Sequence, residues 1–176
     1  ASGGSNSSRS PWNSSSGRPA SAPATSQPAD CVANVTTPTT EAGITTAHEG
    51  ATHLPQFQTM MRASEAGANI IDVIAYPFIT DLEKVLAKYP KDTWGRYENG
   101  LKIGGVKITI DGSPQGKTAF FTTPYLTGGP GGEKNWRGEL TFPQDMVNQM
   151  VKRVYEMGVP LNLHANGDGA IDAFFK

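Results

Sequence analysis

The chain of 176 residues is poor in charge, in cysteine and in long apolar runs, and each shortage excludes a class of protein. Charged residues make up 18% and sum to −1 at pH 7, which excludes an electrostatic footprint for nucleic acid or an anionic membrane over the whole chain. The single cysteine, Cys31, cannot form an internal disulfide. No apolar run approaches the ~20 residues of a membrane-spanning helix. We therefore expect a soluble protein with no nucleic-acid or membrane partner, and we favour the cytoplasm as its location.

Large apolar residues are scarcest at the start of the chain. Residues 1–40 contain ten Ser, five Pro and five Thr, and their only large apolar residues are Trp12, Val32 and Val35. Such a segment cannot bury enough surface to offset roughly 1–2 kcal/mol of backbone entropy per residue. We therefore predict a disordered Ser/Pro/Thr-rich leader over residues 1–40 and a folded domain over residues 41–176.

In the folded part, β-branched runs alternate with helical patterns. We expect strands at residues 44–47, 69–75, 106–110 and 159–164, and helices at residues 54–65, 80–89, 143–157 and from about 168 onward. A long Gly-rich loop over residues 111–139 separates the third strand from the third helix. Loops of that length in compact domains are usually functional or disordered. Strand–helix alternation implies an α/β fold with a mostly parallel sheet and right-handed crossovers.

Two α/β architectures fit this alternation: an open doubly wound sheet and a (β/α)8 barrel of the TIM type. About four β/α units in residues 41–176 are half of a typical ~250-residue barrel. No glycine fingerprint of the dinucleotide or P-loop kind follows any strand. The chain also stops within a helix, without a closing strand. We therefore predict part of a (β/α)8 barrel, of about four units.

The third predicted strand contains a lysine on its less apolar face. Alternation places Val106 and Ile108 on one face and Lys107 on the other, which in a barrel points inward. Such a lysine can snorkel from an exposed strand. If desolvated, it can act as a Schiff-base nucleophile. Its neutral amine can also be carboxylated by carbon dioxide and become an oxygen ligand that bridges two metal ions.

The fourth predicted strand favours the metal interpretation. His164 shares a face with Asn162 and lies at the carboxyl end of the strand, where barrel enzymes hold their catalytic groups. Asp111 and Asp168 follow on the adjacent turns. A histidine, an inward lysine and two carboxylates at one end of neighbouring strands are typical of a metal site. In contrast, we expect His53, in the loop before a helix, to be a surface residue.

Several segments resemble successive motifs of the amidohydrolase superfamily, in the right order and spacing. These are residues 43–50 (GITTAHEG), 105–113 (GVKITIDGS), Tyr125, 136–140 (WRGEL) and 163–170 (LHANGDGA). The pattern is most similar to amidohydrolase family 3, which includes enzymes similar to N-substituted formamide deformylase. The resemblance extends from about residue 41 to residue 176 and covers nothing of residues 1–40.

The resemblance implies roles for individual residues. Lys107 matches the strand-four lysine that is carboxylated and bridges metals in many members, and His164 matches the strand-five histidine ligand. The implied cofactor is one or two divalent ions, zinc first, with iron or manganese as alternatives. Asp111 and Asp168 are the catalytic candidates, and His48, Ser113 and Tyr125 are the substrate-binding candidates. The implied substrate is a small molecule with an amide or cyclic amide.

The chain also departs from the family pattern. Residues 1–40 contain no histidine, so the first-strand His-x-His pair is missing, and the strand-six histidine and strand-eight aspartate would lie beyond Lys176. We therefore expect the central portion of a metal-dependent C–N hydrolase, inactive by itself. A Schiff-base lyase that uses Lys107 is one alternative. A non-catalytic chain that self-associates or forms a homo-oligomer through open sheet edges is another.

Overall fold

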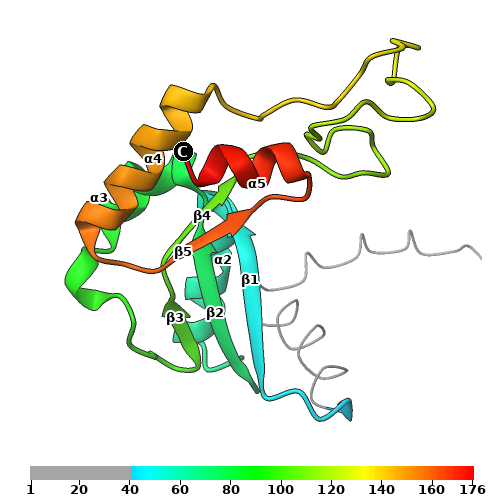
Figure 1. Ribbon diagram of the computed structural model, residues 1–176. Coiled ribbons are helices and arrows are strands. Elements are labelled where there is room, and N and C mark those ends of the chain that lie inside the picture. Colours follow the sequence, from blue (N-terminus) through cyan, green and yellow to red (C-terminus); the bar gives the residue numbers. More distant parts are fainter. Residues whose placement is uncertain (1–40) are drawn as a thin grey trace, which may run out of the picture.

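The computed structural model describes residues 41–176, so the predicted leader at residues 1–40 lies outside the described residues. In chain order the elements are β1 (Thr46–Thr52), α2 (Leu54–Glu65), β2 (Asp72–Pro77), the 3-10 helix η1 (Ile79–Asp81), α3 (Leu82–Lys88), the 3-10 helix η2 (Lys91–Thr93), β3 (Leu101–Ile103), β4 (Val106–Thr109), α4 (Gln144–Met157), β5 (Leu161–His164) and α5 (Asp168–Phe174) (Figure 1). Among the described helices, none has the length and apolar character needed to cross a membrane.

The strands pair in parallel and in sequence order. β1, β2 and β3 form one sheet, and β4 and β5 form a second. Phe78, directly after β2, bridges in parallel to Lys107 of β4 and connects the two sheets. Sequential parallel order is that of a (β/α)8 barrel, whereas a doubly wound sheet reverses its order at a switch point. The described part is thus an α/β fold consistent with a section of such a barrel.

The sequence analysis missed β3, because two glycines interrupt what would otherwise be one long strand. A Cβ on Gly104 would lie 2.4 Å from Cγ2 of Ile74, and a Cβ on Gly105 would lie 2.0 Å from the carbonyl oxygen of Pro160. Neither position therefore accepts a side chain. At these two glycines the pairing partner changes. The chain pairs with β2 up to Ile103, the end of β3, and with β5 from Val106 onward.

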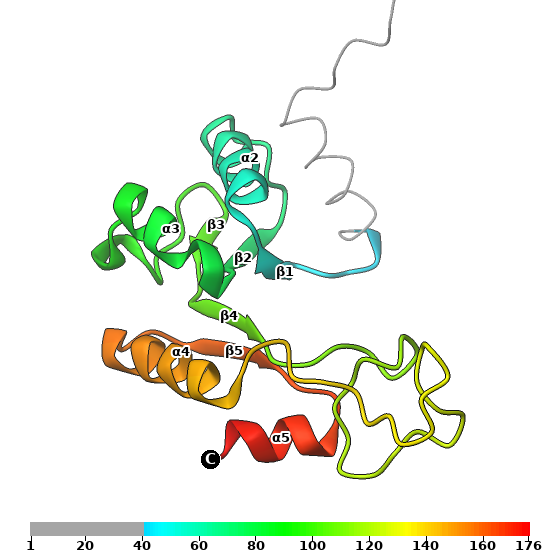
Figure 2. The same ribbon diagram turned by 90° about the horizontal axis from the view of Figure 1, so that it is seen from above.

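The helices cover the aliphatic face of the strands. Figure 2 shows α2 and α3 beside β1, β2 and β3, and α4 beside β5. The buried core joins side chains from these helices to those of β4: Phe57, Val85, Val147, Val154, Val106 and Ile108. Val106 and Ile108 are both fully buried, as the alternation predicted. Lys107 lies on the opposite face, which would point inward in a barrel and is called the inner face below.

Several predicted elements have different bounds in the structure: β4 ends at Thr109, β5 begins at Leu161 and α4 begins at Gln144. The strand expected at 69–75 is Asp72–Pro77, and the exposed Ile70 precedes it. The strand expected at 44–47 is Thr46–Thr52, because β1 pairs with β2 from Thr46 onward. The helix expected at 80–89 is α3, with a 3-10 turn before it. By contrast, the helix expected at 54–65 is confirmed. Gly158 caps the end of α4 with a φ of 66°, in the left-handed region that glycine favours.

Candidate functional site

Lys107 and His164 lie on the same face of adjacent strands. In the β4–β5 ladder Lys107 pairs with Asn162 and Thr109 pairs with His164, so these four side chains share the inner face. His164 is the last residue of β5, at the carboxyl end of the parallel strands. The long loop between β4 and α4 extends beyond the same end (Figure 1). The two predicted metal donors are therefore oriented toward one side of the molecule.

The Lys107 amine is partly buried and has a polar partner. Its Nζ donates a hydrogen bond to Oδ1 of Asn162 at 3.2 Å. Burial lowers the pKa of Lys107 from its ordinary value. A lower pKa increases the fraction of neutral amine, the form required both for carboxylation and for attack on a carbonyl. The partial burial and the lowered pKa are compatible with both chemical interpretations of Lys107.

Asn166, which the sequence analysis did not single out, fixes the ring of His164. Its Nδ2 lies 3.0 Å from Nε2 of His164 and 3.0 Å from the carbonyl oxygen of Gly112. A carbonyl only accepts hydrogen bonds, so the Asn166 atom that faces it is the amide nitrogen. That nitrogen donates its second proton to Nε2, which leaves the ring proton on Nδ1. The only sequence signal was the place of Asn166 within the residue 163–170 motif.

Asp111 is fully buried and serves the backbone. Its carboxylate accepts hydrogen bonds from the N–H groups of Phe120 at 2.9 Å, Asn166 at 2.8 Å and Gly167 at 2.8 Å. Phe120 belongs to the long loop, and the other two donors belong to the turn between β5 and α5. The carboxylate therefore holds the loop against that turn. Both oxygens of the Asp111 carboxylate are engaged by backbone N–H groups. Its catalytic role stays a prediction.

Asp168 forms a second link between α5 and the same loop. Its Oδ1 accepts from the N–H of Thr122 at 2.8 Å, and its Oδ2 accepts from the Thr122 hydroxyl at 2.5 Å. Its pKa lies below the ordinary aspartate value, first because of these hydrogen bonds from Thr122. The side chain is at the solvent-exposed start of α5. Like Asp111, this catalytic candidate is engaged in anchoring the loop.

The three predicted substrate-binding residues lie in different surroundings. The exposed Ser113 accepts a hydrogen bond at its Oγ from the N–H of Gly116 at 3.0 Å. Tyr125 donates from its hydroxyl to the carbonyl of Ala119 at 2.9 Å, and burial raises the pKa of Tyr125. His48 is exposed on β1, with its ring centroid 5.6 Å from that of Tyr76. Their contacts thus hold the long loop and β1 in shape, and substrate binding stays a prediction.

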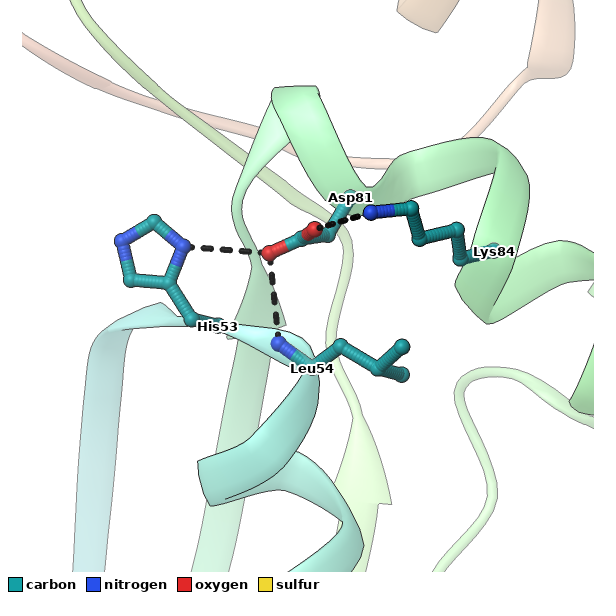
Figure 3. Close-up of polar contacts among 4 residues, drawn as sticks. All are labelled: His53, Leu54, Asp81 and Lys84. Atoms are coloured by element: carbon teal, nitrogen blue, oxygen red, sulfur yellow. Dashed lines mark hydrogen bonds and ion pairs between the residues drawn. The ribbon is translucent and has the colours of Figure 1, made fainter.

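β1 and β2 bring together a histidine and an aspartate that the sequence analysis did not pair. Nδ1 of His53 donates to Oδ2 of Asp81 at 3.1 Å, and the N–H of Leu54 donates to the same oxygen at 3.2 Å (Figure 3). Lys84 Nζ lies 3.6 Å from Oδ1. The His53 side chain is 50% exposed and that of Asp81 only 15%. The hydrogen bond from His53 is the main cause that lowers the pKa of Asp81.

The described residues supply only part of a metal-donor set. Within residues 41–176, no three histidine, cysteine, aspartate or glutamate side chains come together as an ion would require. Lys107 and His164 face the same side, but a catalytic zinc ordinarily has three protein ligands. Nε2 of His164 is also occupied by Asn166 in this conformation. By themselves, the described residues do not fit a resident ion.

The sequential parallel strands, with polar groups at their carboxyl ends, are consistent with a section of a (β/α)8 barrel. The chain belongs to the amidohydrolase family, whose sequence model matches residues 14–176. This match begins before Glu41, so it takes in much of the segment in which we recognised no family motif. A comparison with curated proteins finds no match.

Two solved structures share the fold. One is described as an uncharacterized metal-dependent hydrolase from Pyrococcus horikoshii OT3, with a TM-score of 0.69 and 22% identity over 83% of this chain. The other has the same description and comes from Pyrococcus furiosus, with a TM-score of 0.68 and 23% identity over 82% of this chain. The chain spans only 29% of the length of each of these structures.

Proposed function

We propose that this chain forms part of a metal-dependent hydrolase that cleaves C–N bonds, and that Lys107 and His164 are two of its metal donors. One observation carries the proposal: the β4–β5 register places both side chains on the inner face, near the carboxyl ends of adjacent parallel strands. Membership of the amidohydrolase family supports the hydrolase class. Zinc is the first choice of ion for histidine and carboxylate-type ligands, with iron or manganese as alternatives.

The chain's own residues hold Lys107 and His164 in position, and a metal bound at Nε2 of His164 would have to displace the Asn166 amide. Asn162 accepts a hydrogen bond from the Lys107 amine, and burial favours the neutral amine that carboxylation requires. Asn166, itself held by Asp111, fixes the ring of His164. When bound, a divalent ion lowers the pKa of water to about 7 and polarises a carbonyl group.

We propose a small amide as the substrate, of the kind that N-substituted formamide deformylases and cyclic amidohydrolases cleave. The support is the motif pattern over residues 105–113 and 163–170, which is most similar to family 3. The family match and the shared fold support the coarser class, a hydrolase.

We propose further that the chain does not turn over amides by itself. Its described residues bring two donors to the inner face, and it spans 29% of the length of the two hydrolases that share its fold. Turnover then requires donors supplied by the rest of a barrel. The purified chain, given zinc or manganese and bicarbonate, should hydrolyse N-formyl, N-acyl and cyclic-amide substrates no faster than a Lys107→Ala/His164→Ala control.

The proposal is tested by metal analysis of a barrel-length gene product that contains this sequence. Lys107→Ala should remove bound metal and amide hydrolysis together. Lys102→Ala is the matched control, because Lys102 lies on β3, toward the opposite end of the strands. Retention of metal and activity in Lys107→Ala would contradict the assignment. Borohydride trapping of a carbonyl substrate on Lys107 would instead favour the Schiff-base lyase.

A further inference from the structure

A pocket of about 450 Å³ opens toward the amino end of the strands, away from the proposed metal donors. Two of its walls come from residues 91–95 and residues 158–160, the segments that lead into β3 and β5. Because the strands are parallel, the segments that precede them lie at the amino end, and Figure 1 shows both segments on the side away from the long loop. β2 and β3 form the third wall. No residue to which the family resemblance gave a role lines this pocket.

The charged residues that line the pocket are two lysines, Lys91 and Lys102. Nζ of Lys91 donates to the carbonyl oxygen of Met157 at 2.7 Å, which fixes this ammonium group at the wall. Lys102 also borders a second hollow that contains Glu65 and Glu98. Within residues 41–176, neither lysine forms an ion pair with a carboxylate. Two ammonium groups without an acidic partner give the pocket a positive potential, which attracts an anion.

The uncharged walls of the pocket are aromatic. Tyr76 and Trp94 both line it, and Trp94 is only 9% exposed. The indole N–H of Trp94 donates to the carbonyl oxygen of Tyr89 at 3.0 Å, so the indole ring is held in place. Nζ of Lys102 lies 4.4 Å from the centroid of the Tyr97 ring, which holds the second ammonium group. A planar ring packs well against aromatic walls that are fixed in this way.

Gly104 keeps the inner end of the pocket open. A Cβ at this position would lie 2.4 Å from Cγ2 of Ile74 and 3.1 Å from the hydroxyl oxygen of Tyr76, so no side chain fits there. The Tyr76 hydroxyl is a hydrogen-bond donor for a carboxylate. The volume lies within the roughly 300–1,000 Å³ of small-molecule pockets, which combine apolar walls with a few polar groups.

We propose that this pocket binds a small aromatic carboxylate, with its ring against Tyr76 and Trp94 and its carboxylate at Lys91 and Lys102. Ammonium–carboxylate hydrogen bonds are charge-assisted and supply the selectivity for an anion. The inference does not depend on the proposed hydrolase activity. Exchange of Lys102 alters this pocket at the amino end of β3 and leaves the metal donors on β4 and β5 in place.

The test uses the fluorescence of Trp94 and benzoate as the probe. In the full 176-residue chain with Trp12→Phe and Trp136→Phe, Trp94 is the one remaining tryptophan. Benzoate should change its fluorescence saturably. Benzamide, which has the same shape without the charge, and acetate, which has the charge without the ring, should each bind at least about tenfold more weakly, the loss expected when a charge-assisted hydrogen bond or a ring contact is missing.

Exchange of Lys102 tests the anion site directly, because Lys91 also holds the Met157 carbonyl. Lys102→Met should weaken benzoate binding at least about tenfold, with an unchanged circular dichroism spectrum, and Lys102→Arg should restore it. Lys134→Met, which removes one positive charge from the exposed loop, is the matched control and should bind benzoate as before. An absence of saturable binding, equal binding of benzamide, or unchanged affinity in Lys102→Met would overturn the proposal.

Discussion

Asp111 shows how a carboxylate within a functional motif can serve the backbone. A fully buried carboxylate costs free energy unless its oxygens accept hydrogen bonds, and the N–H groups of Phe120, Asn166 and Gly167 donate to both of them. The motif predicted a carboxylate shortly after the strand that carries Lys107, and Asp111 follows the end of β4. It did not predict that the loop and the β5–α5 turn would close around it, because those donors come from residues 9 to 56 positions away in sequence.

We predict that Asp111→Ala destabilises the fold by about 3 kcal/mol, because one buried and two partly buried N–H groups lose their acceptor. Urea unfolding followed by circular dichroism measures the change. Asp172→Ala, on the exposed face of α5, is the matched control and should stay within about 0.5 kcal/mol of the wild type. Equal stability of the two variants would show that Asp111 does not hold the loop.

We predict that Asn166→Asp inverts the tautomer of His164. The wild-type amide donates to Nε2 and leaves the proton on Nδ1, whereas a carboxylate can only accept and therefore draws the proton to Nε2. Nitrogen-15 NMR of the neutral ring distinguishes the two forms. Asn148→Asp on α4 makes the same chemical change without contact to His164 and should leave the tautomer as it was. An Nε2–H ring in the wild type would contradict the contact.

The loop between β4 and α4 is ordered by its own contacts. The N–H of Phe121 donates to the carbonyl of Arg137 at 2.7 Å, and that of Tyr125 donates to Trp136 at 2.8 Å, so the loop folds back on itself. Gly167 of the β5–α5 turn admits no side chain, because a Cβ there would lie 1.9 Å from the Phe120 carbonyl oxygen. Length and glycine content predicted a long loop beyond the strands, and Figure 2 shows it there.

We predict that the Asp168 link to this loop is lost in acid. The folded-state pKa of Asp168 is lower than the ordinary value of 3.8, so the link stabilises the fold above that value and is lost as pH falls through the lower, folded-state pKa. The amide resonances of Thr122 and Gly169 should shift over that acidic range. In Asp168→Asn, those shifts should be absent. Identical acid titration of both amides in the two proteins would refute the link.

For the helices and strands, sequence periodicity predicted the elements whose conformation depends on residues nearby in sequence. Pro55 near its start and Gly67 past its end predicted the helix at 54–65, and the spacing of apolar residues predicted the helix at 143–157. Alternation predicted that Lys107 lies on the face opposite Val106 and Ile108. β3 was missed because Gly104 and Gly105 separate its three residues from β4, and because no local pattern shows their pairing with β2. The partnership of His53 with Asp81 was missed for the same reason, since 28 positions separate them in sequence.

For the molecule as a whole, we predict self-association of the isolated chain. Within residues 41–176, β1 and β5 each pair on one side only, and unpaired strand edges attract other strands. Sedimentation velocity should show species that grow with concentration. Thr46→Lys, which places a charge on the exposed start of β1, should reduce them. A monodisperse wild-type monomer with a cooperative thermal transition would contradict this prediction.

The central claim is that this chain presents Lys107 and His164 as two metal donors of a hydrolase site, and that residues 41–176 supply no complete set of donors. The most direct measurement is the zinc content of the purified 176-residue chain after incubation with zinc and bicarbonate and removal of free ions. We predict weak binding, with well under one zinc ion retained per chain, because two protein ligands are fewer than the three that ordinarily hold a catalytic zinc ion. One or more ions retained per chain, and lost in His164→Ala, would contradict the account and show a complete site.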